Sequence, residues 1–409
     1  MRNGTGRLSA KIVSLLVLVI CASAMTLAGT KAASANFNRF IENLWPEAQR
    51  AGVSRATFVK AFKGVTPDPE VIERAENQAE FKTPIWDYLD LRVSEARIDN
   101  GRQTLRKHLA TVDAIEKRYG VPKSIIMAIW GMETNYGSHM GDKYVIRSLA
   151  TLAYTGRRQR FGRQQLIAAL KILERGDIPP AAMTGSWAGA MGYTQFIPTT
   201  YNAYAVDWNG DGRRDIWRNP ADAMASTANY LRKAGWKPGV PWGWEVALPH
   251  GFNRKLAGLK SGRSVGDWHK LGVKLANGSN FRADSPIRAY LLLPAGANGP
   301  AFLVTDNFKA ILRYNNSHAY ALAVGHLADR IEGKGPIVAN WPRPANELTV
   351  KDRMELQVLL SARGYDTGKI DGTLGPQTRS AVMRAQRDAG QPADGEPTAM
   401  LLKHLRSDG

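Results

Sequence analysis

The stretch that most constrains the fold is IIMAIWGMETNYG, residues 125–137, because it is almost wholly apolar and yet carries one carboxylate. Pro122 and Gly137 are typical of the start and the stop of a helix. Glu133 falls on the same helical stripe as the apolar side chains. That stripe consists of Ile126, Ile129, Trp130 and Tyr136. The sequence therefore predicts a buried helix with an acidic side chain near its carboxyl end.

Burial and the negative end of a helix both disfavour a charged carboxylate, so we expect the pKa of Glu133 to be raised. A carboxyl group that is partly protonated near neutral pH can act as a general acid. The alternative is a buried glutamate paired with one of the many arginines, and this stretch alone favours neither. His139 lies close by in the sequence, where a surface histidine is the simpler interpretation.

The first 35 residues have the pattern of a secretory signal. Basic residues precede an apolar run at 12–20, and small residues end in Ala33-Ser34-Ala35, so we expect cleavage after Ala35. The run is too short for a membrane span, and no later segment is apolar enough for one. Cys21 lacks the small residues that precede a lipidated cysteine, which favours soluble export to the periplasm over a lipid anchor.

Cys21 is the only cysteine, so a mature chain would contain no disulfide and no thiol nucleophile. The signal holds four basic residues and no acidic one, and its removal lowers the formal charge from +19 to +15. Such a charge indicates a polyanionic partner or a solvated basic surface. For an exported protein, an acidic wall polymer or an anionic membrane surface fits better than nucleic acid.

The remaining 374 residues read as mainly helical, with one β-containing segment. We expect helices through 36–120, with a longer one at 93–112 and a break at 83–88 whose aromatic residues could line a groove. Strand-like runs fall within about 240–305. Helix returns at 308–331. A stiff Pro-rich linker at 341–346 then leads to a separate module at 347–409 with three short helices.

Two segments between these helices carry candidate binding residues. Residues 185–192 are rich in glycine and alanine, which indicates close approach of the backbone, and they contain Ser186. Gln195 follows among aromatic residues, a combination common in sugar-binding sites. Arg157 and Arg158 begin a basic cluster that could position an anionic substrate, hold Glu133, or simply form a solvated helix face.

Residues 207–222 resemble the calcium loop of an EF-hand. Asp207, Asn209 and Asp211 occupy positions 1, 3 and 5 of that loop, and Gly212 occupies position 6. Arg213 would contribute only its backbone carbonyl at position 7. Arg218 replaces the usual glutamate at position 12, and Asp222 could close the site from the next helix. We expect a structural Ca²⁺ or Na⁺ here; the alternative is a simple Asp-Gly turn.

The sequence lacks the motifs that mark several classes of enzyme. The chain has no G-x-S-x-G elbow, no H-E-x-x-H helix and no Walker-type phosphate loop. Its seven histidines are scattered, and none lies at metal-ligand spacing from another.

Four motifs in order, AIWGMETNYG, GAMGYTQFIPTTY, VDWNGDGRRDIW and LRYNNSHAY, resemble the lytic murein transglycosylase B family over residues 36–340. The segment LQVLLSARGYDTGKIDGTLGPQTRSAVMRAQ resembles a type-1 peptidoglycan-binding domain. The resemblance implies a mainly α, lysozyme-like α+β catalytic domain with a small inserted β-sheet, followed by a C-terminal three-helix peptidoglycan-binding domain.

The resemblance also implies site residues. Glu133 matches the catalytic acid/base of the family, and Arg157 and Arg158 match a basic pair near the active site. The metal loop matches at Asp207, Asn209, Asp211, Arg213 and Asp222. Positions associated with the sugar-binding groove are Ser186, Gln195, Tyr230, Tyr314, Asn315 and Tyr320.

The implied reaction cleaves the bond between N-acetylmuramic acid and N-acetylglucosamine and leaves a 1,6-anhydro end, with no cofactor in the chemistry. A hydrolytic muramidase is an alternative that would need a second carboxylate, for which Asp142 is the nearest candidate. A non-catalytic wall-binding protein is another. We expect a monomer whose partners are peptidoglycan strands and other cell-wall enzymes, with no nucleic acid and no transmembrane segment.

Overall fold

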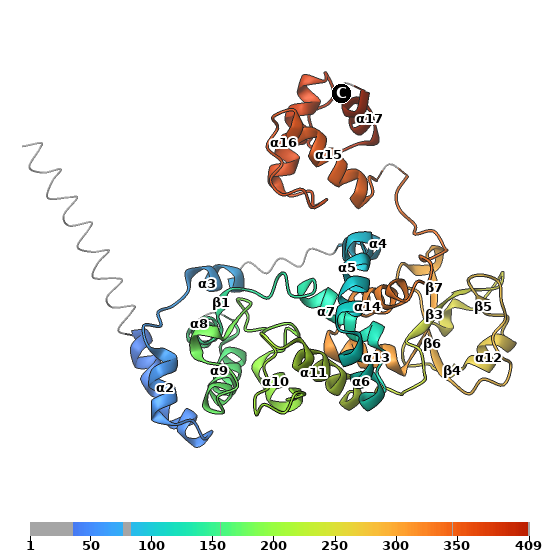
Figure 1. Ribbon diagram of the computed structural model, residues 1–409. Helices are drawn as coiled ribbons and strands as arrows, with labels where there is room; N and C mark the ends of the chain where they lie inside the picture. The colour runs from blue at the N-terminus through green and yellow to red at the C-terminus, as the bar shows by residue number, and fades with distance from the viewer. Residues whose placement is uncertain (1–35, 77–82, 156, 346, 408–409) are drawn as a thin grey trace, which may run out of the picture. The chain divides into compact units, whose positions relative to one another are not determined.

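The computed structural model describes residues 36–76, 83–155, 157–345 and 347–407 (Figure 1). The expected signal peptide at 1–35 lies outside the described residues. The chain is mostly helical and forms two compact units. The first unit takes the chain up to Glu80 together with Gly137–Ser226, and the second takes Phe81–Tyr136 and Thr227–Gly409.

The first unit is built around two helices that pack along each other, α8 (Val145–Tyr154) and α9 (Gln159–Glu174). Their contact faces bury leucine and alanine side chains, which helical spacing places on one face of each helix. The two-stranded sheet pairs β1 (Lys143–Tyr144) with β2 (Thr184–Gly185). The other helices are 36–50, α2 (Arg55–Phe62), α3 (Pro69–Glu76), α10 (Pro198–Tyr204) and the first part of α11 (Pro220–Lys233).

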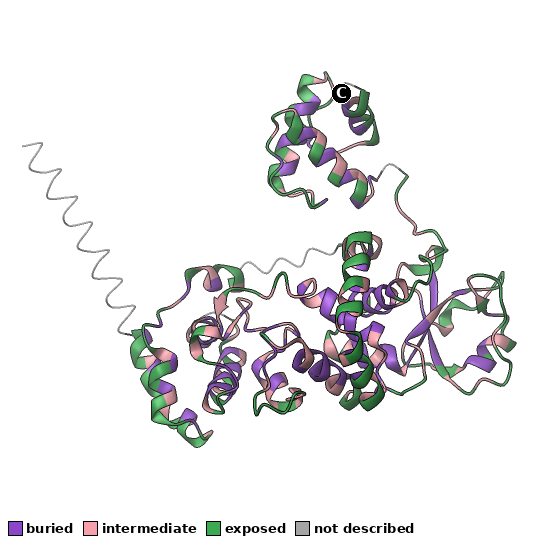
Figure 2. Ribbon diagram, viewed as in Figure 1, coloured by how far each residue is buried: buried purple, intermediate pink, exposed green. Residues whose placement is uncertain are grey.

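The second unit is organised around α7 (Lys123–Thr134), which packs against α14 (His318–Ile331) and α5 (Glu95–Lys107). Nearly every residue of α7 is buried, as expected for a helix that is apolar on all sides (Figure 2). The remaining helices around it are α4 (Ile85–Arg92), α6 (Leu109–Tyr119) and α13 (Asp306–Tyr314). This arrangement fixes the position of Glu133, because α7 has little freedom to move.

An antiparallel sheet of five strands also belongs to the second unit, in the order β4-β6-β7-β3-β5. Its two central strands β6 and β7 are almost completely buried (Figure 2). Helix α12 (Val265–Lys270) places the fully buried Trp268 against the sheet. The strands are β3 (Gly243–Ala247), β4 (Arg263–Ser264), β5 (Lys274–Leu275), β6 (Arg288–Leu292) and β7 (Ala301–Thr305).

Three helices at the C-terminus enclose a small core of their own: α15 (Val350–Ala362), α16 (Pro376–Asp388) and α17 (Ala399–Ser407). Thr349 caps α15 in a capping box with Asp352, in which each side chain accepts from the backbone N–H of the other residue. Gln357 is fully buried, and its side chain is bonded to the turn at 369–373.

The structure differs from the sequence prediction in three helices. The helix expected at 93–112 is interrupted at His108, where α5 ends and α6 begins. The segment expected as a break at 83–88 is instead the start of α4, with Pro84 as its N-cap, a position where proline costs no hydrogen bond. The helix expected at 308–331 is broken after Tyr314, because Ser317 caps the start of α14.

Candidate active site

Glu133 lies in the last turn of α7, one residue before the helix ends. The helix ends earlier than the predicted Gly137, because Asn135 and Tyr136 adopt left-handed backbone conformations with φ of 47° and 59°. Two successive non-glycine residues in this region are strained, and such strain persists where the surroundings hold it. Tyr136 is held by its hydroxyl, which donates to the carbonyl of Arg97 over 3.1 Å.

The chain can turn here because Gly131 has no side chain at the place where the Tyr136 ring packs. A Cβ at Gly131 would come within 2.5 Å of the Tyr136 hydroxyl oxygen, so a larger residue would displace the tyrosine ring. Gly131 therefore allows the Tyr136 ring to pack at the end of α7 and takes no part in the chemistry of Glu133.

The Glu133 carboxyl group is partly buried and accepts a hydrogen bond of 2.5 Å from the Tyr320 hydroxyl to its Oε1. Burial raises the pKa of Glu133 to about 7. The Tyr320 hydrogen bond and the positive charge of Arg92 act in the opposite direction, since both favour the carboxylate. The outcome is a group that is about half protonated near neutral pH.

Tyrosines surround this carboxyl group within the second unit. Burial raises the pKa of Tyr314 and of Tyr320 well above the usual value, and the charge of Glu133 raises both further. Tyr314 also meets Tyr230 edge to face, with ring centroids 5.0 Å apart and planes at 69°. The structure therefore brings together Glu133 and the predicted groove residues Tyr230, Tyr314 and Tyr320, while Asn315 follows Tyr314 as an exposed residue at the end of α13.

Two residues of α4 belong to this site: Tyr88, from the segment 83–88 whose aromatic residues were expected to be able to line a groove, and Arg92, which the sequence analysis did not single out. Burial raises the pKa of Tyr88, and the charge of Glu133 raises it further. Arg92 is the cation that acts on Glu133, and its guanidinium lies 5.7 Å from the centre of the Tyr88 ring. They are four residues apart on one helical face, so a helix predicted at 85–92 would have paired them.

The glycine-rich segment of the first unit forms tight turns that fix Ser186 and Gln195. The Ser186 hydroxyl accepts from the backbone N–H of Ala190 over 3.0 Å. Gln195 has a left-handed backbone with φ of 50°, and its side-chain nitrogen donates to the carbonyls of Met140 and Gly192 at 3.1 and 2.9 Å. These bonds occupy the Gln195 nitrogen and leave its side-chain oxygen as the acceptor for other groups.

The two predicted arginines of the basic cluster have different surroundings. Arg158 lies with its guanidinium 4.3 Å from the centre of the Phe161 ring, which is a cation–π contact. Arg157 is exposed.

The acidic loop, which begins at Asp207 after α10, is held together by its own backbone N–H groups. The two oxygens of Asp207 accept from the backbone N–H groups of Gly210 and Gly212, each at 2.8 Å. Asp211 accepts from the N–H of Arg213 at 2.9 Å. The side-chain oxygen of Asn209 accepts from the N–H of Asp211 at 3.4 Å.

Asp222 anchors the loop from α11. It is fully buried, and its two oxygens accept from the backbone N–H groups of Trp208 and Asp215 at 2.9 and 2.8 Å. Burial raises the pKa of Asp222, and the negative charges of Asp207 and Asp211 raise it further. A buried carboxylate close to two others is a donor set that suits a hard cation, although within the described ranges no group of three His, Cys, Asp or Glu side chains is arranged to hold one.

Within the part of the chain that the structure describes, no helix is both long and apolar enough to cross a membrane.

Comparison with known proteins identifies matches over most of the chain. The transglycosylase SLT domain family matches residues 36–329, and a peptidoglycan binding domain family matches residues 349–405. Membrane-bound lytic murein transglycosylase B of Escherichia coli K12 is 29% identical over 329 residues, which cover 75% of this chain and 85% of that protein.

Solved structures resemble the chain as well. SltB3 from Pseudomonas aeruginosa, crystallised in complex with NAG-anhNAM-pentapeptide, is 52% identical with a TM-score of 0.74, over 90% of this chain and 99% of that one. The Escherichia coli lytic transglycosylase Slt35 in complex with calcium is 28% identical with a TM-score of 0.61, over 74% of this chain and 94% of that one.

Proposed function

The chain belongs to the transglycosylase SLT domain family, and we propose that Glu133 is the single acid/base with which this peptidoglycan lytic transglycosylase works. The bond cleaved is the β-1,4 linkage between N-acetylmuramic acid and N-acetylglucosamine, and the muramic acid leaves as a 1,6-anhydro end. The observation that supports this role is a carboxyl group whose pKa is raised to about 7 and whose Oε1 accepts from a buried tyrosine.

Both halves of the reaction use the same carboxyl group. Protonated Glu133 gives its proton to the glycosidic oxygen as the bond to the anomeric carbon breaks. The resulting carboxylate then takes the proton of the muramic 6-hydroxyl, whose oxygen attacks the anomeric carbon and closes the anhydro ring. The 2-acetamido oxygen of the sugar stabilises the positive charge in between. A pKa near 7 suits a group that must donate and then accept.

We propose that the aromatic and polar residues named above bind the glycan. In the second unit, Tyr320 orients the Glu133 carboxyl group, and Tyr230, Tyr314 and Asn315 contact sugar rings. In the first unit, the Ser186 hydroxyl donates to sugar oxygens, and the side-chain oxygen of Gln195 accepts from sugar hydroxyls. Arg157 and Arg158 attract anionic groups of the polymer. Tyr88 and Arg92 complete the surroundings of Glu133.

A hydrolytic muramidase is the competing reaction, and it would need a second carboxylate beside Glu133 to activate water. The charged group that acts on the pKa of Glu133 is the cation Arg92. Asp142, the candidate nearest in sequence, is exposed. This favours the transglycosylase reaction.

The mass of the products separates the two reactions. Purified sacculi are digested with the full-length protein, and the released disaccharide peptides are weighed. We expect anhydro products that are lighter by one water than the reducing sugars. Products that carry the mass of a reducing muramic acid would replace the proposal with the hydrolytic one.

We further propose the domain organisation and location indicated by the sequence. A signal peptide at 1–35 directs export to the periplasm, a catalytic domain spans 36–340, and a peptidoglycan-binding domain spans 347–409. Peptidoglycan strands are the partner of both domains. Fractionation of cells that express the full chain tests the location, since the mature form should appear in the periplasmic fraction without its first 35 residues.

For the acidic loop we propose a structural Ca²⁺ or Na⁺ bound by Asp207, Asn209, Asp211, Asp222 and the carbonyl of Arg213. The cation would offset the mutual repulsion of these carboxylates and would take no part in the reaction. The test is the thermal midpoint with calcium and with a chelator, which should differ in the wild-type protein and coincide in the Asp207→Ala variant. Equal midpoints in the wild-type protein would exclude Ca²⁺, and the same comparison with and without Na⁺ tests the alternative ion.

A further inference from the structure

A basic hollow lies in the first unit, on residues that the proposed reaction does not use. Its volume is about 330 Å³, at the lower end of the range for small-ligand sites. The floor is apolar and includes the buried Leu173 and Ile178 and the rigid pair Pro179 and Pro180. Proline has no N–H to donate, so the floor offers shape rather than hydrogen-bond donors.

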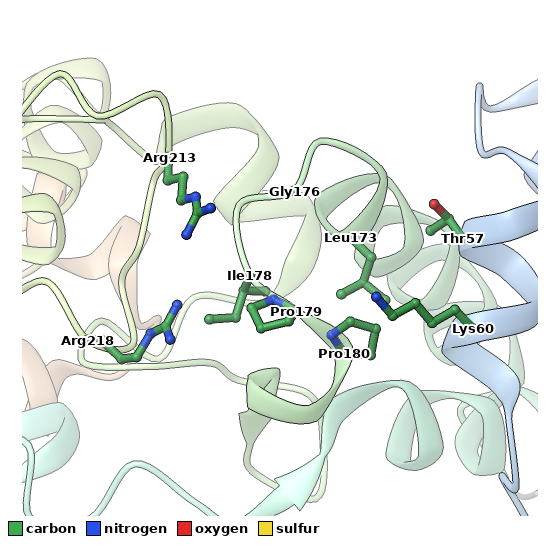
Figure 3. Close-up of a pocket in the computed structure, with 9 residues that line it drawn as sticks. All are labelled: Thr57, Lys60, Leu173, Gly176, Ile178, Pro179, Pro180, Arg213 and Arg218. Atoms are coloured by element: carbon green, nitrogen blue, oxygen red, sulfur yellow. The ribbon is translucent and has the colours of Figure 1, made fainter.

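Three cations from separate segments lie around this floor. Lys60 comes from α2, while Arg213 and Arg218 come from the acidic loop. Figure 3 shows the two arginines on one side of the hollow and Lys60 on the opposite side, with Ile178 and the two prolines between them. The lining contains no acidic side chain.

Two carboxylates close to the lining already have partners, and Glu174 also bonds Thr57, a residue of the lining. Glu174 accepts from the N–H and hydroxyl of Ser54, each at 2.9 Å. Asp177 lies between Arg175 and Arg214, with contacts of 3.0 and 2.8 Å.

The three cations of the lining are therefore only partly compensated. Asp215 holds the Nε of Arg218 at 2.9 Å, whereas Asp211 bonds the backbone N–H of Arg213 and acts on the guanidinium of that residue only through its charge. Lys60 forms no ion pair within the described part of the chain. The hollow thus keeps a net positive charge over an apolar floor, which favours an anionic ligand.

From this arrangement we infer that the hollow is an accessory site for the stem peptide of peptidoglycan, bound through its carboxylates. Cations on opposite sides suit a ligand with two separated anionic groups, and the apolar floor suits the methyl groups between them. Guanidinium groups bind carboxylates through paired hydrogen bonds. The inference rests on the proposed function, since it takes peptidoglycan as the polymer that the protein engages.

The shape of the site favours a peptide over a membrane. An anionic bilayer presents a broad surface of head groups and is best met by a protruding basic face. Here the cations lie on opposite sides of a small hollow with apolar residues between them, an arrangement that fits two separated carboxylates of one peptide.

The test is calorimetric titration of the full-length protein with free stem pentapeptide, which contains no glycosidic bond. We expect Lys60→Glu to weaken one binding event roughly tenfold, because an attraction becomes a repulsion. Lys63→Glu is the matched control, since Lys63 is an exposed lysine at the end of the same helix and lies outside the lining.

A second titration uses pentapeptide whose carboxylates are converted to carboxamides. The wild-type protein should lose at least tenfold in affinity, and Lys60→Glu should lose less than the wild type, because its contact between Lys60 and a carboxylate is already gone. Circular dichroism of each variant confirms that the fold is retained.

Two outcomes would overturn the inference. Equal pentapeptide affinity in the wild-type protein, Lys60→Glu and Lys63→Glu would show that the hollow does not take the peptide. Loss of binding to phosphatidylglycerol vesicles in Lys60→Glu, with peptide binding intact, would make it a membrane contact instead. In both cases the wild-type protein would still release anhydro products from sacculi, whereas a failure of the proposed function would abolish that release.

Discussion

Glu133 on α7 and Asp211 in the loop after α10 carry the same functional group in opposite surroundings. Burial raises the pKa of Glu133 to about 7, with one hydrogen bond from Tyr320 acting against it. The pKa of Asp211 is lowered, first by the Asn209 side chain and then by the backbone N–H of Arg213. One carboxyl group is prepared to hold a proton, and the other is prepared to stay charged.

The difference shows how the fold assigns roles to carboxyl groups. An apolar helix that is enclosed on nearly all sides can supply burial but few donors, so the charged form of Glu133 is disfavoured. A loop rich in glycine exposes backbone N–H groups, which stabilise carboxylates at the surface. The carboxyl group on the helix is therefore suited to proton transfer, and the carboxylate in the loop is suited to a structural role in which it stays charged.

The largest effect is expected from removing the proton of Glu133. Glu133→Gln keeps the shape and the hydrogen bond to Tyr320 but cannot transfer a proton, so turnover of sacculi should fall by at least about 10³-fold. Asp211→Asn makes the same chemical change in the loop and should leave turnover within about twofold. Release of anhydro-muropeptides measures both, and comparable losses in the two variants would erase the distinction between the regions.

The same substitution should stabilise the fold at alkaline pH. The folded pKa of Glu133, about 7, lies above the ordinary value of 4.5, so the wild-type protein loses stability as the pH rises from 4.5 through 7. Glu133→Gln has no such loss. We expect it to be more stable than the wild type by up to about 3 kcal/mol at pH 8.5 and equally stable at pH 4. Urea unfolding at the two pH values tests this prediction. If the variant and the wild type differ in free energy of unfolding by the same amount at both pH values, the prediction is contradicted.

Loss of the tyrosine hydroxyl should shift the pH profile of the reaction. The Tyr320 hydrogen bond lowers the pKa of Glu133, so Tyr320→Phe should raise that pKa and move the alkaline limb of kcat/KM to higher pH. Loss of the positioning bond should also reduce kcat about 10- to 100-fold. Tyr290→Phe is the control, because that hydroxyl bonds Asp306 over 2.9 Å in the same unit. An unchanged limb in Tyr320→Phe would show that the bond does not act on Glu133.

The smallest effect is expected in the loop. A substitution there should destabilise the fold, whereas Glu133→Gln should stabilise it. Asp207→Ala leaves the N–H groups of Gly210 and Gly212 without their acceptors, which should destabilise the protein by about 1–2 kcal/mol. Thermal unfolding measures it, with activity at low temperature retained. Stabilisation of the fold by this substitution would mean that the loop carboxylates repel one another more than the backbone holds them.

The sequence predicted much of the fold because local signals agreed with the structure. The strand-like runs predicted within about 240–305 are found there as β3 to β7, and the three short helices predicted within 347–409 are α15, α16 and α17. The mainly α fold with a small sheet, and membership of the transglycosylase family, are confirmed by the matches over 36–329 and 349–405. Glu133 stood out because a carboxylate interrupts an apolar stripe.

The remaining features depend on contacts between distant residues. Tyr320 bonds Glu133 across 187 positions of sequence, a pairing that no local pattern contains. Arg92 was overlooked, and Tyr88 was assigned to a break rather than to a helix, because Pro84 was interpreted as the sign of a break, whereas it caps α4. The early end of α7 follows from the Tyr136 ring lying over Gly131, which a predicted stop at Gly137 could not anticipate.

The most direct test of the account is the protonation state of Glu133 itself. Difference infrared spectroscopy of the full-length protein, with Glu133→Gln as the reference, isolates the carboxyl band of this residue as the pH is changed. The account predicts a protonated band that titrates with a pKa of about 7 and is absent in the variant. A carboxylate that is already fully charged at pH 5.5 would contradict it, since no proton would then be available for the glycosidic oxygen.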